Sequence, residues 1–159
     1  MAAGDHATII ALVESTIEAI TPYAVSGTPA PTVFRKSEGP SMGAAQSRQF
    51  DVMIASFTRR NDTGVNSTTA FVERAMDFEV RVLFSHGHDA LTDFAVVVFE
   101  DVRRIQDKVV RAVREAGGGT YACWCPDPAR PESGPAEMSI FVTIPFHVQW
   151  NENEYVSGA

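Results

Sequence analysis

The sequence lacks an apolar stretch long enough to cross a membrane. Its longest uninterrupted one, residues 94–99, falls far short of the roughly 20 residues that a membrane-spanning helix needs. No basic residue precedes an apolar run within residues 1–8, and Glu14 and Glu18 interrupt the segment that follows. These absences predict no signal or transit peptide and no membrane partner, so we expect synthesis in the cytoplasm.

Cysteine and positive charge are also scarce. Cys123 and Cys125 are the only cysteines, and 13 basic residues stand against 20 acidic ones, a formal net charge of -7. A disulfide across one intervening residue is strained, so we expect reduced thiols. The acidic balance repels phosphate backbones and argues against tight nucleic-acid binding, although it suits a conduit through which DNA slides without sticking.

The common catalytic signatures are missing as well. The chain contains no Gly-x-Ser-x-Gly elbow, phosphate-binding loop, dinucleotide-binding glycine fingerprint or His-Glu-x-x-His zinc motif. We therefore expect no catalytic residue, no cofactor and no enzymatic activity.

What is present is the composition of an ordinary folded domain. Of 159 residues, 45% are hydrophobic and 21% are charged, which places the chain far from the compositions of disordered proteins. A chain of this length fits one domain. We expect residues 1–150 to form it and residues 151–159 to be a polar C-terminal tail.

Apolar residues near the helical period predict two helices. The first spans residues 5–20, with Asp5 as a cap and Thr21-Pro22 at its end. The second spans residues 91–115 and stops at a triple glycine beginning at Gly117. Its expected sheet-covering face is Leu91, Phe94, Ala95, Val98, Val102, Ile105, Val109 and Ala112, and its expected polar face is Glu100, Asp101, Arg103, Arg104, Asp107, Lys108 and Arg111.

Alternation of apolar and polar residues predicts the strands. The expected strands are residues 32–35, 50–58, 71–84, 120–125 and 138–150, with a turn at 61–64 and a proline-rich loop at 126–136. Residues 50–84 thus form a long hairpin, and Pro145 is expected to mark an edge or a bulge. The expected class is α+β: an antiparallel sheet with a long hairpin, with one long amphipathic helix and an N-terminal helix packed on one face.

Two groups of residues are candidates for a site. His86 and His88 could supply zinc with two nitrogens, and Cys123 and Cys125 with two sulfurs, if the pairs met in space. The alternative makes the histidines a polar turn and the cysteines small strand residues on either side of Trp124. Arg59, Arg60 and Asp62, which the pattern puts at the hairpin tip, are candidates for contact with a neighbouring subunit.

The predicted order of helix, long hairpin, long helix and closing strand resembles the tail terminators of long-tailed phages. The details most similar to that family are residues 77–82, leading into the second helix, and residues 144–150 near the end. The resemblance implies a structural virion protein of the tail or neck. It would form a homo-oligomeric ring, commonly a hexamer, that caps the tail tube and joins it to the head.

The implied partners are further copies of the chain, the tail-tube protein, head-tail connector proteins and DNA passing through the lumen. The neighbouring roles of head-tail connector and tail-tube subunit remain open. A hypothesis of another class is a small zinc-binding enzyme or ligand-binding domain built on the histidine and cysteine pairs.

Overall fold

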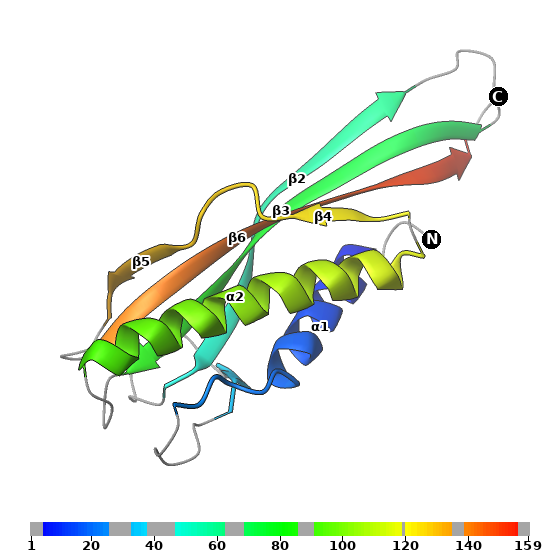
Figure 1. Ribbon diagram of the computed structural model, residues 1–159. Helices are drawn as coiled ribbons and strands as arrows, with labels where there is room; N and C mark the ends of the chain where they lie inside the picture. The colour runs from blue at the N-terminus through cyan, green and yellow to red at the C-terminus, as the bar shows by residue number, and fades with distance from the viewer. Residues whose placement is uncertain are drawn as a thin grey trace.

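The chain has an α+β fold in which two helices lie against one face of a six-stranded sheet (Figure 1). A computed structural model describes residues 5–25, 33–37, 47–62, 69–85, 91–118, 120–134 and 139–155. Its elements are α1 (Asp5–Glu18), β1 (Arg35–Lys36), β2 (Gln49–Asp62), β3 (Thr69–Ser85), α2 (Leu91–Ala116), β4 (Ala122–Trp124), β5 (Arg130–Ser133) and β6 (Ser139–Tyr155).

The sheet has the order β1-β2-β3-β6-β4. β5 pairs with β6 on the same side as β4, but at residues 140–143 of β6 instead of 147–149. β2, β3 and β6 form a continuous antiparallel ribbon, with Val52 opposite Val80 and Val80 opposite Ile144. The register between β2 and β3 shifts once, at Ala55, between Ile54 and Ser56. Only β1 runs parallel to its neighbour, so the sheet is mixed where a purely antiparallel one was expected.

The core lies between the helices and the alternate residues of the three long strands. From β3 it takes Met76, Phe78, Val80, Val82 and Phe84, and from β6 it takes Val142, Ile144, Phe146, Val148 and Trp150. The rings of Phe78 and Phe146 are stacked with centroids 5.1 Å apart. The helices contribute Ile9, Val13 and Ile17 from α1 and Ile105, Val109 and Val113 from α2.

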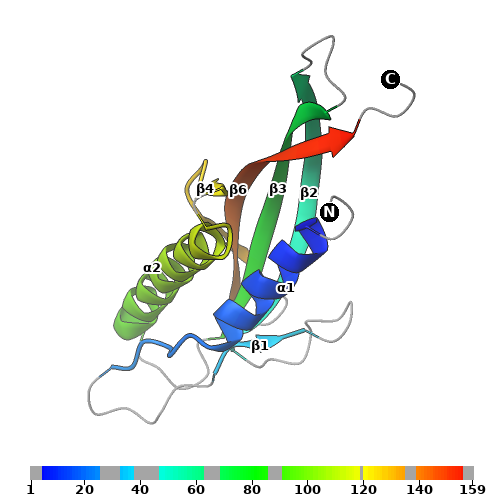
Figure 2. The same ribbon diagram turned by 90° about the vertical axis from the view of Figure 1, so that its right-hand side faces the viewer.

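The three long strands are longer than the helical layer. β3 and β6 each have 17 residues, or about 56 Å of extended chain. The 26 residues of α2 give only about 39 Å of helix. Both views show the far ends of β2, β3 and β6 projecting past the helices (Figure 2); we call this part, residues 60–62, 69–73 and 151–155, the overhang.

Several predicted strand boundaries were wrong. The strands expected at residues 32–35 and 120–125 are shorter in the structure, as β1 (Arg35–Lys36) and β4 (Ala122–Trp124), whereas the long strands extend beyond their expected bounds. β2 continues to Asp62 and β3 begins at Thr69, so the hairpin is longer at both ends than expected. β6 continues to Tyr155 through residues that were expected to be a polar tail. β5 lies inside the expected proline-rich loop. Pro145 is not at a bulge, because it pairs with Glu79 in unbroken register, but it does mark a local edge: on its other side β6 has no strand partner between the β4 and β5 pairings within the described residues.

The predicted faces of α2 need two corrections. Ile105 and Val109 are buried as expected, but Ala95 is exposed and Val97 is buried instead. Asp101 was expected on the polar face and is fully buried, because it binds groups beneath the helix. Neither helix has the length and apolar composition that crossing a membrane requires.

Candidate assembly surface

The face of the sheet turned away from the helices, here called the open face, is the broadest candidate site. Its central row runs across four strands, because the register places Ser56 of β2 opposite Asp77, Asp77 opposite His147, and His147 opposite Trp124. The bulge at Ala55 puts Ser56 in this row, since one extra residue reverses which side chains of β2 point to each face. Widely separated parts of the sequence therefore meet in one line.

The members of this row are in direct contact. Ser56 donates its hydroxyl proton to Asp77 Oδ2 over 2.8 Å, and His147 Nδ1 lies 2.6 Å from Asp77 Oδ1. The ring of Trp124 lies 4.5 Å from that of His147 and is 39% exposed. Partial burial raises the pKa of Asp77, but hydrogen bonds from His147 and Ser56 outweigh it and hold the pKa below its ordinary value.

This geometry does not make a nucleophile. In a catalytic triad the histidine lies between the serine and the carboxylate and takes the serine proton. Here the carboxylate lies between the other two, so the Ser56 hydroxyl meets Asp77, a weak base of lowered pKa, and does not contact the imidazole of His147. The row is suited to fixing side chains in place and to presenting Trp124 and His147 to a partner.

A second pair of contacts continues the open face toward β5. Arg130 lies 3.2 Å from Glu79, and Arg81 lies over the ring of Phe141 at 4.0 Å from its centroid. Arg81 is also 3.9 Å from Glu132. Exposed pairs of this kind add little stability each, but both link β5 to β3 across β6 and keep the short strand in place.

The outer edge of β2 is the second part of the candidate surface. β1 pairs with β2 only at Gln49 and Phe50, and within the described residues no other strand pairs with this edge. Three large apolar side chains of β2 are exposed: Met53 at 41%, Ile54 at 42% and Phe57 at 58%. Unpaired edges with apolar side chains are sites at which another chain can add a strand.

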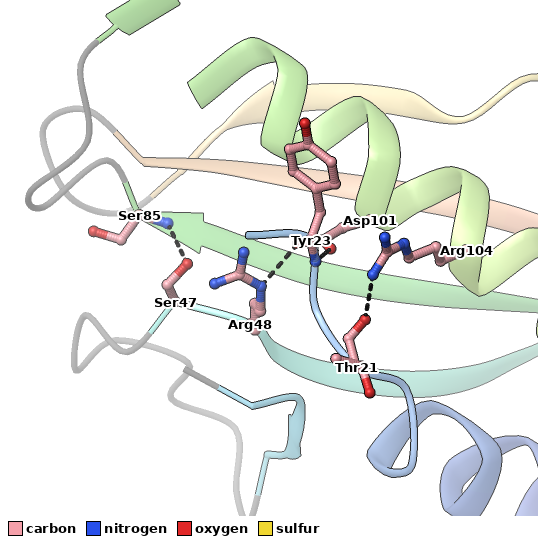
Figure 3. Close-up of polar contacts among 7 residues, drawn as sticks. All are labelled: Thr21, Tyr23, Ser47, Arg48, Ser85, Asp101 and Arg104. Atoms are coloured by element: carbon pink, nitrogen blue, oxygen red, sulfur yellow. Dashed lines mark hydrogen bonds and ion pairs between the residues drawn. The ribbon is translucent and has the colours of Figure 1, made fainter. Parts of the chain in front are cut away.

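A buried polar cluster connects α2 to Arg48 and to the segment that follows α1 (Figure 3). Asp101 of α2 accepts hydrogen bonds from Arg48 Nε at 2.8 Å and from the Tyr23 backbone N–H at 2.7 Å. Arg104 donates to the Thr21 carbonyl at 2.7 Å. Burial raises the pKa of Asp101, against the opposing effects of the Tyr23 N–H and of Arg48.

The backbone of Arg48 is also unusual. It is the one non-glycine residue of the described chain with positive φ, at 69°, a conformation that is uncommon without glycine. Its N–H bonds the Leu83 carbonyl at 2.6 Å, and its carbonyl accepts from Arg35 at 3.1 Å. The Arg48–Asp101 pair therefore joins α2, β1, β3 and the segment after α1, which is a structural role that the sequence pattern did not reveal.

Two shallow grooves flank the helices. One of about 730 Å³ lies between α2 and Cys125, and one of about 600 Å³ lies between the end of α1 and α2 beside Arg104 and Lys108. The first carries both charge signs, from Asp107, Arg111, Arg114 and Glu115. Neither groove brings together a set of catalytic groups.

The predicted metal ligands are only partly within the described residues. His86 and His88 lie outside them, so their meeting with the cysteines stays a prediction. Cys123 lies in β4, as the alternative expected, and faces the core, whereas Cys125 follows the end of this strand and lines the first groove. Burial, with a smaller effect of Cys125, raises the pKa of Cys123 to about 12, and burial with Asp107 raises that of Cys125 to about 11.

In the metal-free chain both thiols are therefore protonated at neutral pH. No group of three His, Cys, Asp or Glu side chains within the described part of the chain could hold a metal ion.

The predicted subunit-contact residues lie in the sheet instead of a turn. Arg59, Arg60 and Asp62 belong to β2, opposite Arg74, Glu73 and Phe71. They follow the exposed Phe57 along the strand toward the overhang. Their role in subunit contact stays a prediction, and the more informative residues, Met53, Ile54 and Phe57, were missed because a half-buried strand was expected there.

Comparison with known proteins gives no family. No family model matches the chain, and no curated protein matches it in sequence.

Proposed function

We propose that this chain is a structural virion protein, a tail terminator that assembles into a homo-oligomeric ring. The ring caps the tail tube and joins it to the head, with tail-tube and connector proteins as neighbours. The protein acts by binding and assembly and carries no catalytic residue or cofactor.

The observation that carries this proposal is the overhang. Strands of 17 residues are about three times the usual five or six, and their ends have no helical layer to pack against. A lone chain gains little by extending three strands away from its core. The extension is useful if a neighbouring subunit or the tail tube covers it.

The charge of the chain and its layout support the same proposal. A net charge of -7 suits a lumen through which DNA passes without binding tightly. The arrangement of an N-terminal helix, a long hairpin, a long helix and a closing strand resembles that of tail terminators. This is similarity of layout, and the ring is inferred by analogy from it.

The experiment is the solution mass by light scattering, followed by negative-stain images of the main species. With a chain mass of 17.3 kDa, a hexameric ring gives roughly 100 kDa. Closed rings support the terminator role, and long stacks of discs favour a tail-tube subunit instead. A species of one or two copies at every concentration contradicts a ring that closes by itself.

A matched pair of variants tests whether the long strands form the ring contact. Glu73→Arg reverses a charge on β3 in the overhang, away from the outer edge of β2, and Arg103→Glu reverses a charge at a side chain of α2 that is 62% exposed. We expect the first variant to lose the ring and the second to keep it. Loss of the ring in the α2 variant alone would place the contact on the helices.

A further inference from the structure

The free edge of β2 has a sequence and a backbone geometry suited to pairing with itself. β1 ends beside Phe50, where Ser37 N–H bonds the Phe50 carbonyl at 2.8 Å. From Val52 onward the edge has no strand beside it in the described chain. This part of β2 contains Met53, Ile54 and Phe57, each at least 41% exposed.

The direction of the backbone groups can be followed along this edge. Arg48 and Phe50 turn their carbonyls outward to β1, and alternate residues of a strand turn the same way, so Val52 and Ile54 also face outward. The bulge at Ala55 resets the alternation. Beyond it, Phe57 and Arg59 are the residues whose backbone groups face the free edge.

We infer that two copies of the chain pair antiparallel through this edge, with Ile54 of each copy opposite Phe57 of the other. The two-fold axis then passes between Ala55 and Ser56, at the bulge. Val52 lies opposite Arg59 and Met53 opposite Thr58, so outward-facing backbone meets outward-facing backbone and each sheet face continues into its copy. In the single chain the Val52 N–H donates to Asp51 Oδ1 at 2.9 Å; on pairing this N–H turns to the copy and the Asp51 carboxylate turns to Arg60.

The side chains select this register over its neighbours. A shift by one residue places side chains from opposite faces against each other. A shift by two in one direction sets Asp51 against Asp62 of the copy, and in the other it sets Ile54 against Ala55. In the inferred register Asp51 stands opposite Arg60 at both ends, and the exposed apolar residues meet in the centre.

This pairing goes beyond the proposed ring and does not rest on it. A two-fold contact joins two copies and cannot by itself close a ring of six. If both proposals hold, rings associate in pairs and the mass corresponds to roughly twelve copies. If only the edge pairing holds, the mass is that of a dimer, so the two proposals fail separately.

Cysteine cross-linking tests the register. The double variant Met53→Cys/Thr58→Cys places two thiols opposite each other in a closely spaced pair, within disulfide reach. We expect a covalent dimer under mild oxidation from the double variant only. The single variants and the unchanged protein, with Cys123 buried and Cys125 partly buried, set the background. No dimer from the double variant overturns the inference.

Charge and apolar variants give an independent readout by solution mass. We expect Phe57→Lys to halve the mass, whereas Phe99→Lys, at an α2 side chain that is 67% exposed, leaves it unchanged. Asp51→Arg sets like charges together and weakens association at least tenfold, and Asp51→Arg/Arg60→Asp restores it. Failure of the double exchange to restore association, or halving by Phe99→Lys alone, overturns the inferred contact.

Discussion

The two ends of the same three strands differ in what holds them. At one end, β2, β3 and β6 pack beneath α1 and α2, and the helix-facing positions of β6 from Val142 to Trp150 are buried. At the other end the strands pair with each other in the overhang, and neither α1 nor α2 nor any other described segment forms a layer against them. The comparison separates strand pairing, which runs the full length, from core packing, which stops partway.

The sequence changes where the layer stops. The helix-facing row of β6 is apolar from Val142 to Trp150, and in the sequence the apolar alternation ends there, with Glu152 and Glu154 following in the same strand. Tyr121 closes the covered end, with its ring 5.8 Å from that of Trp150 in an edge-to-face contact. Beyond Trp150 the strands remain paired through their backbones, and charged residues in an uncovered strand oppose its aggregation with other chains.

The largest effect we expect is at the buried anchor of the covered end. Asp101→Ala leaves Arg48, with its side chain 7% exposed, as a buried charge without its partner, and frees the Tyr23 N–H. Breaking such a pair costs about 3–5 kcal/mol. Urea unfolding followed by circular dichroism would measure the loss.

A control separates the charge from the packing at this site. The variant Arg48→Met/Asp101→Leu removes both charges, and we expect it to lose less stability than Asp101→Ala alone. Equal or greater loss in the double variant would mean that the Arg48–Asp101 bond itself, and not the orphaned charge, provides the stability.

Two phenylalanines of the same sheet allow a direct comparison of how much a buried and an exposed side chain contribute to stability. Phe146 is fully buried and stacks on Phe78, whereas Phe57 is 58% exposed. Phe146→Ala should cost about 3–5 kcal/mol and Phe57→Ala no more than about 1.5 kcal/mol in the dissociated chain, the upper value for its edge-to-face contact with the His6 ring at 5.3 Å. Similar losses in urea unfolding at low protein concentration would show that β2 is packed as tightly as β6.

Sequence alone predicted the covered half well. Periods of two and of 3.6 identified β3, β6 and both helices, because each buries one face and burial imposes its period on the sequence. The same reasoning ended β6 at Trp150, five residues before Tyr155. Pairing without burial leaves no apolar alternation, so the end of the pattern was mistaken for the end of the strand.

The candidate site was less predictable for a related reason. Asp101 follows Glu100 in an acidic helix segment, and only the fold shows that Arg48 comes from below to meet it. The open-face row depends on a bulge at Ala55 that nothing in the sequence marks. Contacts between residues 70 positions apart, such as Asp77 with His147, require the strand register, which periodicity does not supply.

The smallest effect we expect concerns the open face, at Asp77. Its pKa is lowered in the folded chain, so the contribution to stability is present above the ordinary value of about 3.9 and is lost as pH falls through the folded pKa. Because the side chain is 45% exposed, the contribution should stay within about 1 kcal/mol.

Urea midpoints measured from pH 7 down to about pH 3 would test this dependence. Asp77→Asn should be slightly less stable than the unchanged protein at neutral pH. The gap should narrow once the pH falls below the ordinary value of about 3.9 and close as the pH falls through the lower pKa of folded Asp77. Asp107→Asn, at a 66% exposed side chain of α2, is the matched control. A stability difference between Asp77→Asn and the unchanged protein that stays constant across the pH range would mean that Asp77 stabilises the fold through its packing and not through its charge. The row from Ser56 to Trp124 would then be held by packing.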